Sequence, residues 1–342
     1  MIPIGRKTAV LLCFLLCLLI MGGCHSQPPE TQRDIFAMDT YMRLKAYGEQ
    51  APQALREAAA EIQRLEALFS VNESESDIAR LRKADGQSVT VAPETAELLN
   101  TALTLCEHTD GALDITIYPV LRAWGFTDTA YTVPSADTLK ELLSLVDYRA
   151  VQLHELNVTL PPQTAIDLGA VAKGYTGDRL CALLRQAGVT SALLNLGGNV
   201  QAVGTKPDGT AWQVGIADPK GGEPVATVAI EDCAVVTSGS YERFFVAEDG
   251  RKYHHILDPQ TGYPVDNGLV SVTIIGKSGV LCDALSTAFF VMGLEKSAAY
   301  WKTHPEIEAL WMTEDNKLYL TEGLVDLITT KEPYTVIKRG AS

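Results

Sequence analysis

Hydrophobic residues recur every three or four positions in the N-terminal half of the chain, which is the period of an amphipathic α-helix. The clearest case spans residues 51–69, where Leu55, Ile62 and Leu65 alternate with polar positions. The same spacing predicts further helices over residues 94–108, 136–146, 170–187, 282–292 and 295–304. Two of these stop before Gly188 and Gly293, because glycine readily adopts the conformation that ends a helix.

Short runs rich in β-branched and aromatic residues follow, mainly in the C-terminal half. The most distinct is the LVSVTII run over residues 269–275. Further strands are predicted over residues 192–196, 212–216, 225–230, 244–247, 252–257, 309–313 and 317–321. Because helices and strands do not alternate steadily, the pattern favours an α+β fold over a doubly wound parallel sheet. We expect a single compact domain with a mixed or antiparallel sheet and flanking helices.

The charge balance narrows the class of ligand. The 342 residues include 28 Lys and Arg against 42 Asp and Glu, a formal net charge of −14. Nucleic acid is therefore excluded as an expected partner, because phosphate backbones are bound by Lys and Arg. An acidic protein that binds a phosphate-bearing ligand is expected to recruit a divalent cation for it.

The N-terminus has the pattern of a lipoprotein signal. Arg6 and Lys7 precede a 14-residue apolar run, shorter than the ~20 residues that span a bilayer but typical of a signal peptide. The sequence Met-Gly-Gly-Cys that ends at Cys24 resembles a lipobox, in which the cysteine is lipidated. We expect residues 1–23 to be a signal peptide and residues 24–34 a lipidated N-terminus and tether. The protein is then a membrane-anchored, extracytoplasmic lipoprotein that faces the periplasm or the cell surface. An uncleaved membrane anchor is the alternative, and it also places the body outside the cytoplasm.

Four cysteines remain in the body, at positions 106, 181, 233 and 282. They form no CxxC pair, which disfavours a zinc site, and we expect them to be buried free thiols.

The segment Asp167-Leu-Gly-Ala-Val-Ala-Lys-Gly174 is the first candidate for chemistry. Asp167, Ala170 and Lys173 are spaced by three, which predicts that they share one face of the helix they open. Free backbone N–H groups, the helix dipole and Lys173 together favour an anion. The alternative is a capping aspartate and a solvated lysine.

Two further groups carry candidate side chains. His254 and His255 lie on a predicted strand and point in opposite directions, so only one can enter a given pocket. His255 adjoins a turn that contains Asp258, and it is either structural or a proton acceptor. Asp283 and Thr287 lie one turn apart on the same face of an apolar helix. Their oxygen atoms suit Mg²⁺, although an aspartate that caps its own helix is the alternative.

Taken in order, nine motifs resemble the ApbE family of FAD:protein FMN transferases. The motifs are Met38–Thr40, Phe69–Ile78, Asp110–Asp114, Trp124–Phe126, Asp167–Gly174, Asn195–Asn199, Thr237–Tyr241, His255–Pro264 and Asp283–Thr287. The resemblance implies a T-fold-related flavin transferase domain over residues 35–335. It also implies Mg²⁺-dependent transfer of the FMN part of FAD to a Thr or Ser hydroxyl of a target protein, with release of AMP. The implied acceptors are proteins such as the flavin-carrying subunits of membrane redox complexes.

The resemblance also implies residue roles. The implied metal ligands are the Ala170 carbonyl and the side chains of Asp283 and Thr287. The implied FAD contacts are Met38, Ala112, Leu113, Asp114, Asp167, Lys173, His255 and Leu257. His255 is our candidate base for the acceptor hydroxyl, with Asp258 or Asp167 as alternatives, and Asp283 is essential through its metal. Two other functions stay open: an FAD pyrophosphatase that yields FMN and AMP, and a non-catalytic flavin-binding lipoprotein.

Overall fold

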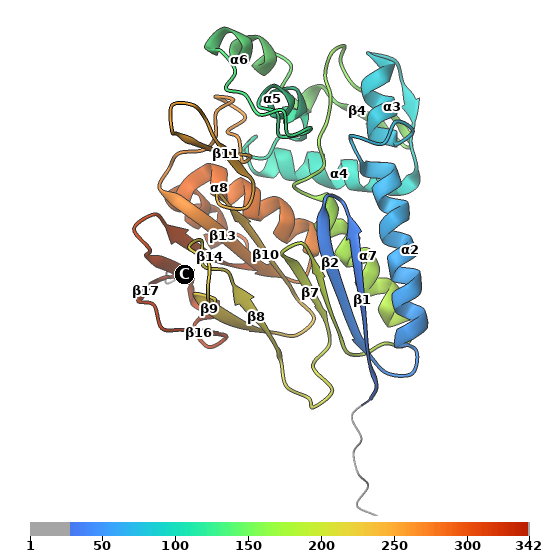
Figure 1. Ribbon diagram of the computed structural model, residues 1–342, viewed down its shortest axis with the longest axis vertical. Helices are drawn as coiled ribbons and strands as arrows, with labels where there is room; N and C mark the ends of the chain where they lie inside the picture. Colours follow the sequence, from blue (N-terminus) through green and yellow to red (C-terminus); the bar gives the residue numbers. More distant parts are fainter. Residues whose placement is uncertain (1–27, 341–342) are drawn as a thin grey trace, which may run out of the picture.

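The computed structural model describes residues 28–340, and its main feature is a nine-stranded sheet (Figure 1). In spatial order the strands are β1 (Glu30–Ala37), β2 (Thr40–Tyr47), β6 (Ala192–Leu196), β7 (Asn199–Val203), β10 (Ala234–Gly239), β13 (Leu269–Gly276), β14 (Ile307–Thr313), β15 (Leu318–Thr321) and β17 (Tyr334–Ile337). Neighbouring strands are antiparallel except for β15 and β17, which are parallel. This mixed sheet with flanking helices confirms the α+β class.

The sheet is covered on both faces. Helices α2 (Ala51–Phe69), α7 (Ala172–Gln186) and α8 (Gly279–Lys302) lie on one face. A small sheet of β8 (Trp212–Ile216), β9 (Ala226–Ile230) and β16 (Ile328–Thr330) covers part of the other. In β10, Val236 packs toward the helices and Val235 toward the small sheet, because successive side chains of a strand alternate. The central strands are therefore apolar on both faces.

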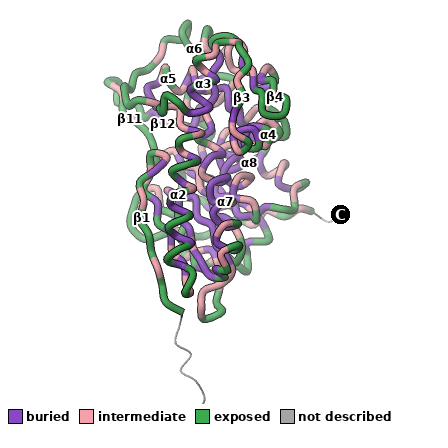
Figure 2. Tube along the Cα trace, turned by 90° about the vertical axis from the view of Figure 1, so that its right-hand side faces the viewer, coloured by how far each residue is buried: buried purple, intermediate pink, exposed green. Residues whose placement is uncertain are grey.

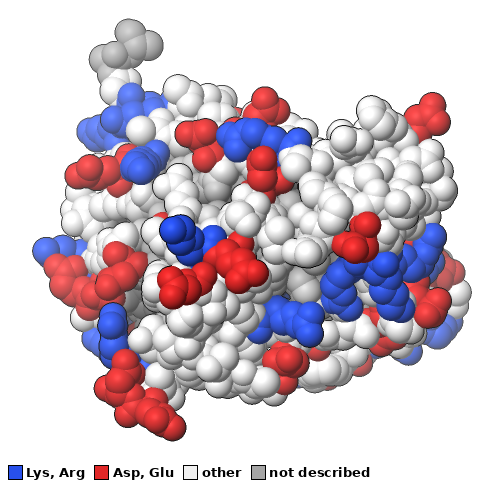
Figure 3. All heavy atoms as spheres, turned by 90° about the horizontal axis from the view of Figure 1, so that it is seen from above, with Lys and Arg blue, Asp and Glu red and all other residues white. Residues whose placement is uncertain are grey.

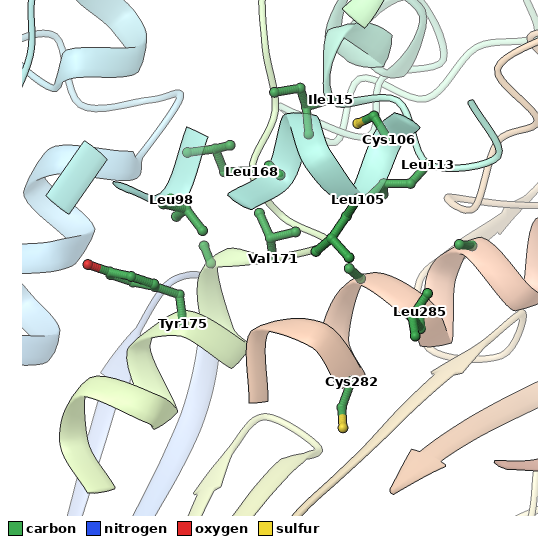
Figure 4. Packing of buried hydrophobic residues seen from close by; sticks show 14 of the residues in the cluster. Leu98, Leu105, Cys106, Leu113, Ile115, Leu168, Val171, Tyr175, Cys282 and Leu285 are labelled. Atoms are coloured by element: carbon green, nitrogen blue, oxygen red, sulfur yellow. The ribbon is translucent and has the colours of Figure 1, made fainter. Parts of the chain in front are cut away.

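A helical cap lies beyond one end of the large sheet (Figure 1). It contains α3 (Asp77–Ala84), α4 (Pro93–His108), α5 (Tyr118–Ala123) and α6 (Ala136–Leu143). Short strands accompany these helices, namely β3 (Val89–Thr90), β4 (Gln152–His154), β5 (Asn157–Thr159), β11 (Phe244–Val246) and β12 (Lys252–His254). Leu98 and Leu105 of α4 pack with Val171 and Leu285, so α4 joins the starts of α7 and α8 (Figure 4).

Most predicted elements are present, with small differences in their bounds. The helices predicted over 282–292 and 295–304 are assigned to one element, α8, which is broken at Gly293, where φ is 76°. The hairpin of β1 and β2 was not predicted, and neither were β3, β4, β5, β7, β10, β16, β17, α3 or α5. Strand β1 begins at Glu30, inside the segment 24–34 predicted as a tether. The predicted signal peptide and Cys24 lie outside the described residues.

Over residues 28–340, each helix is either too short or too polar to cross a bilayer.

The four cysteines of the body are free; Cys106, Cys181 and Cys282 are buried and Cys233 is partly exposed.

Candidate active site

A cavity of about 700 Å³ is lined both by residues of the helical cap and by residues of the large sheet. Its volume is within the ~300–1,000 Å³ range of small-molecule sites. The alternative base Asp258 is absent from the lining. All the other proposed site residues in the described part of the chain line the cavity, namely Met38, Ala112, Leu113, Asp114, Asp167, Ala170, Lys173, His255, Leu257, Asp283 and Thr287. Segments that are far apart in the sequence therefore meet at one site.

The centre of the site depends on a close crossing of α7 and α8. A Cβ atom at Gly174 would lie 2.2 Å from the carbonyl oxygen of Gly279 and 2.7 Å from the Cβ of Asp283. This approach requires glycine, and it allows the Gly174 N–H to donate to Asp283 Oδ2 at 2.8 Å. Asp178 of α7 in turn accepts hydrogen bonds from the first backbone N–H groups of α8, those of Gly279 and Val280, at 2.7 and 3.0 Å. The crossing fixes Asp283 beside the first turn of α7, which carries Lys173.

Asp283 is a buried carboxyl group in a set of hydroxyl and amide side chains. Asp283 is 4% exposed. Burial raises the pKa of its carboxyl group, whereas the positive charge of Lys173 acts to lower that pKa. Asp283 is the fifth residue of α8, and Ser278 is the N-cap, so the capping alternative is wrong. One turn later, the Thr287 hydroxyl lies 3.2 Å from Ser238 Oγ of β10. Asn199 lines the same region, and its buried Nδ2 has no partner among residues 28–340.

The segment before α7 is a loop, not the helical turn that was predicted. We expected Asp167, Ala170 and Lys173 to share a helical face, but α7 begins at Ala172 and residues 167–171 form a loop. The reason is local: Asp167 Oδ1 accepts a hydrogen bond from the Gly169 N–H at 2.8 Å, an Asx turn that competes with the helix. The loop still brings all three residues to the cavity, and it presents Gly169 O to Lys173 Nζ at 3.2 Å.

The two adjacent histidines lie in different environments, although strand β12 ends at His254 and His255 follows it, in place of the strand predicted over residues 252–257. His254 is 8% exposed, and its Nε2 lies 3.0 Å from the carbonyl oxygen of Val265. His255 lines the cavity, and its Nδ1 lies 3.2 Å from the carbonyl oxygen of Arg243. Because a carbonyl can only accept, we assign the proton to Nδ1, which leaves Nε2 as an acceptor. Desolvation, aided by the positive charge of Arg243, lowers the pKa of His255 to about 3, so the ligand-free imidazole is neutral.

The other predicted cofactor contacts line the wall formed by the cap and the β1–β2 turn. Asp114 is 7% exposed, and its Oδ1 accepts from the N–H of Thr116 at 2.8 Å, so it also shapes its own loop. Burial raises the pKa of Asp114. Met38 lies in a two-residue turn with Asp39, where both residues have positive φ. The Met38 N–H donates to Glu66 Oε1 at 2.6 Å, which fixes the turn against α2.

Several lining residues were missed from the sequence. Arg243 adds a second cationic side chain to the cavity, and its Nη2 donates to the Phe126 carbonyl at 2.6 Å. Glu242 beside it has its pKa raised by desolvation. Both follow directly after the Thr237–Tyr241 motif, and this adjacency is the signal that could have indicated them. The face seen in Figure 3 carries acidic and basic side chains interspersed.

A cavity with a buried carboxyl group, adjacent hydroxyls, two cationic side chains and a neutral imidazole combines groups that can bind phosphate oxygens with a group that can accept a proton. The ApbE family model matches residues 38–311. The chain is 34% identical to the FAD:protein FMN transferase of Treponema pallidum over 356 aligned positions, covering 97% of this chain and 98% of that one. The chain therefore belongs to the ApbE family.

Solved structures agree with this assignment. The ApbE protein of Thermotoga maritima superposes with a TM-score of 0.82 at 31% identity, over 86% of this chain and 98% of the other. The apo form of the flavinyl transferase ApbE of Pseudomonas stutzeri gives a TM-score of 0.80 at 28% identity, over 89% and 98% of the two chains.

Proposed function

We propose that this protein is a Mg²⁺-dependent FAD:protein FMN transferase. The observation that carries the proposal is that one cavity collects Lys173, His255, Asp283 and Thr287 from three separate motifs. In the proposed reaction the acceptor Thr or Ser oxygen bonds to the FMN phosphorus of FAD. The bond from that phosphorus to the bridging oxygen breaks, and AMP leaves with the bridging oxygen. The hydroxyl proton passes to a base.

The donor chemistry at the centre of the site suits Mg²⁺. The Asp283 carboxylate, the Thr287 hydroxyl and the Ala170 carbonyl are all hard oxygen donors, and all three residues line the cavity. Asp283 is buried, and one of its oxygens, Oδ2, is hydrogen-bonded to Gly174, so a cation would compensate the cost of its buried charge. When bound, Mg²⁺ would neutralise negative charge on the pyrophosphate.

The chain's own residues supply the remaining functions. Lys173 and Arg243 would bind and orient the pyrophosphate oxygens. His255 Nε2 would accept the hydroxyl proton, because Nδ1 is held by the Arg243 carbonyl. The negative charge of bound FAD would raise the pKa of His255 above its ligand-free value and make it a stronger base. Asp167 also lines the cavity and is the alternative acceptor of the proton.

We further propose that residues 1–23 are a signal peptide and that Cys24 carries the lipid. The protein is then held at the outer side of a membrane, where flavin-carrying subunits of redox complexes would be its acceptors. Since β1 begins at Glu30, the tether would consist of the residues between Cys24 and that strand.

The test uses the full-length protein, FAD, Mg²⁺ and a Thr-bearing acceptor domain of a flavin-carrying redox subunit. AMP release is measured, and the denatured acceptor band is examined for flavin fluorescence. We expect AMP together with a fluorescent acceptor, and neither with the acceptor's Thr→Ala version. If several authentic acceptors all yield AMP and free FMN, the protein is an FAD pyrophosphatase and not a transferase. FAD binding without AMP release would indicate a flavin carrier.

A further inference from the structure

Strand β1 is a free edge of the nine-stranded sheet. It pairs with β2 over eight residue pairs without a register shift, and β2 then pairs with β6 on its other side. The strand runs along one margin of the molecule, and most of its residues are exposed (Figure 2). It contains no proline and no bulge, which are two common ways of protecting an edge from another strand.

The hydrogen-bond alternation identifies which backbone groups face outward. Ala37 and Thr40 close a two-residue turn, and the Gly48 N–H donates to the Pro29 carbonyl at 3.0 Å. In an antiparallel pair the bonded residues alternate, so the odd-numbered residues of β1 bond to β2. The even-numbered ones, including Gln32, Asp34 and Phe36, direct their N–H and C=O groups to the free edge. Within residues 28–340 these outward groups have no hydrogen-bond partner.

The end of this edge nearest the cavity is apolar. Phe36 is 74% exposed, and its cross-strand neighbour Tyr41 is 53% exposed. Farther along, Glu30 and Asp34 are each paired with a basic residue of β2. Arg33 is exposed and, within the described part of the chain, forms no ion pair. The edge therefore offers main-chain groups, an aromatic pair and one free positive charge.

The edge is continuous with the active site. Strand β1 ends at the Met38–Asp39 turn, and Met38, Asp39 and Thr40 all line the cavity. Phe36 precedes this turn by two residues, about 7 Å along an extended strand. A strand added to the edge would lie ~4.8 Å from β1, and its next residues would reach the cavity mouth.

We propose that the acceptor polypeptide binds as an added strand on the free edge of β1 and thereby presents its Thr or Ser hydroxyl to the cavity. This inference rests on the proposed transferase function, which requires a polypeptide beside the bound FAD. Main-chain pairing holds an extended segment in a defined register. Phe36 and Tyr41 would contact its side chains on one face, and Arg33 favours an acidic residue in the segment.

The test compares Phe36→Pro with Phe36→Ala in the full-length protein. Proline removes the outward N–H of residue 36 and leaves the bonds of Ile35 and Ala37 to β2 in place, whereas alanine removes only the ring. Asp34→Pro and Asp34→Ala form a second matched pair, in case the first proline variant fails to fold. The measurements are kcat/KM for the acceptor domain, FAD affinity and thermal melting.

We expect each proline variant to lose about tenfold in acceptor kcat/KM relative to its alanine partner, the value of one main-chain hydrogen bond and its register, with unchanged FAD affinity. The Thr→Ala acceptor should also slow amide exchange in the 30–37 segment of the native protein. Equal kcat/KM in folded proline and alanine variants would overturn the proposal, as would unchanged exchange. If the protein dimerises through β1 and flavin transfer to the acceptor is unaltered in the proline variants, the edge binds a second copy of this chain, and the proposal is also overturned. If the native protein attaches no flavin to any acceptor, the transferase function itself fails.

Discussion

Replacing Gly174 with alanine tests how the site is assembled. The new Cβ would lie 2.2 Å from the Gly279 oxygen, and both of its nearest neighbours there are backbone atoms that cannot rotate away. Helices α7 and α8 must then separate by about 1 Å to restore a normal contact. Overpacking costs ~1–3 kcal/mol, and alanine recovers ~1 kcal/mol of helix propensity. The difference is a net loss of up to about 2 kcal/mol in the free energy of unfolding, with a fall in Tm of up to about 8 °C.

The same shift would displace Asp283 from Lys173 and from the N–H of residue 174. Loss of such a supporting contact typically weakens metal binding by about tenfold or more. We therefore expect the Mg²⁺ concentration for half-maximal AMP release to rise about tenfold. Gly188→Ala is the control, because Gly188 has φ of +81° and an open environment, so it loses ~1 kcal/mol through backbone strain without affecting Mg²⁺. An unchanged Tm and an unchanged Mg²⁺ dependence in Gly174→Ala would refute the reasoning.

Three further predictions concern charge. Asp178→Ala removes the acceptor for the N–H groups of Gly279 and Val280 at the start of α8 and should lower the free energy of unfolding by about 1–2 kcal/mol in a urea titration; no change would contradict this role. Lys173→Met should lower kcat/KM for FAD by about 10- to 100-fold, the value of a charged hydrogen bond to phosphate, and an unaffected kcat/KM would exclude contact with the pyrophosphate. The pKa of His255 is lowered to about 3 in the folded state, whereas the unfolded chain binds a proton below pH ~6.5. The neutral histidine therefore stabilises the fold above pH 6.5, and this contribution is lost as the pH falls toward 3. Between pH 6.5 and 5 the loss is at most about 2 kcal/mol, and His255→Gln should show less acid sensitivity by thermal melting; an identical pH profile would contradict this.

Elements with a strong pattern could be predicted from the sequence. Strand β6 and strand β8 coincide with their predicted ranges, because their buried residues alternate or run together in apolar stretches. Strand β1 could not be recognised, since an exposed edge lacks a buried face and its residues are mostly polar. Helix α7 was extended too far because its periodicity includes Ala170, whereas the Asp167 side chain stabilises a turn.

The residues of the site also divide into those that a local sequence pattern indicates and those that it does not. Helical spacing placed Asp283 and Thr287 on one face, and strand alternation separated His254 from His255. These local rules made the residues candidates, whereas their proposed roles come from the family resemblance. Arg243 reaches the cavity only through the pairing of distant strands and loops, and a single sequence carries little information about such pairing. The hydrogen bonds from the start of α8 to Asp178 join residues 100 and more positions apart, beyond any local pattern.

The most direct test of the account measures AMP and acceptor-bound flavin in the same reaction, in the native protein and in Asp283→Ala. We predict that the native protein releases one AMP for each flavin bound to the acceptor, in a Mg²⁺-dependent manner, and that Asp283→Ala produces neither while it remains folded. AMP in large excess over bound flavin, with free FMN as the product, would contradict transfer to protein. Full activity of Asp283→Ala at the native Mg²⁺ concentration would contradict the metal site.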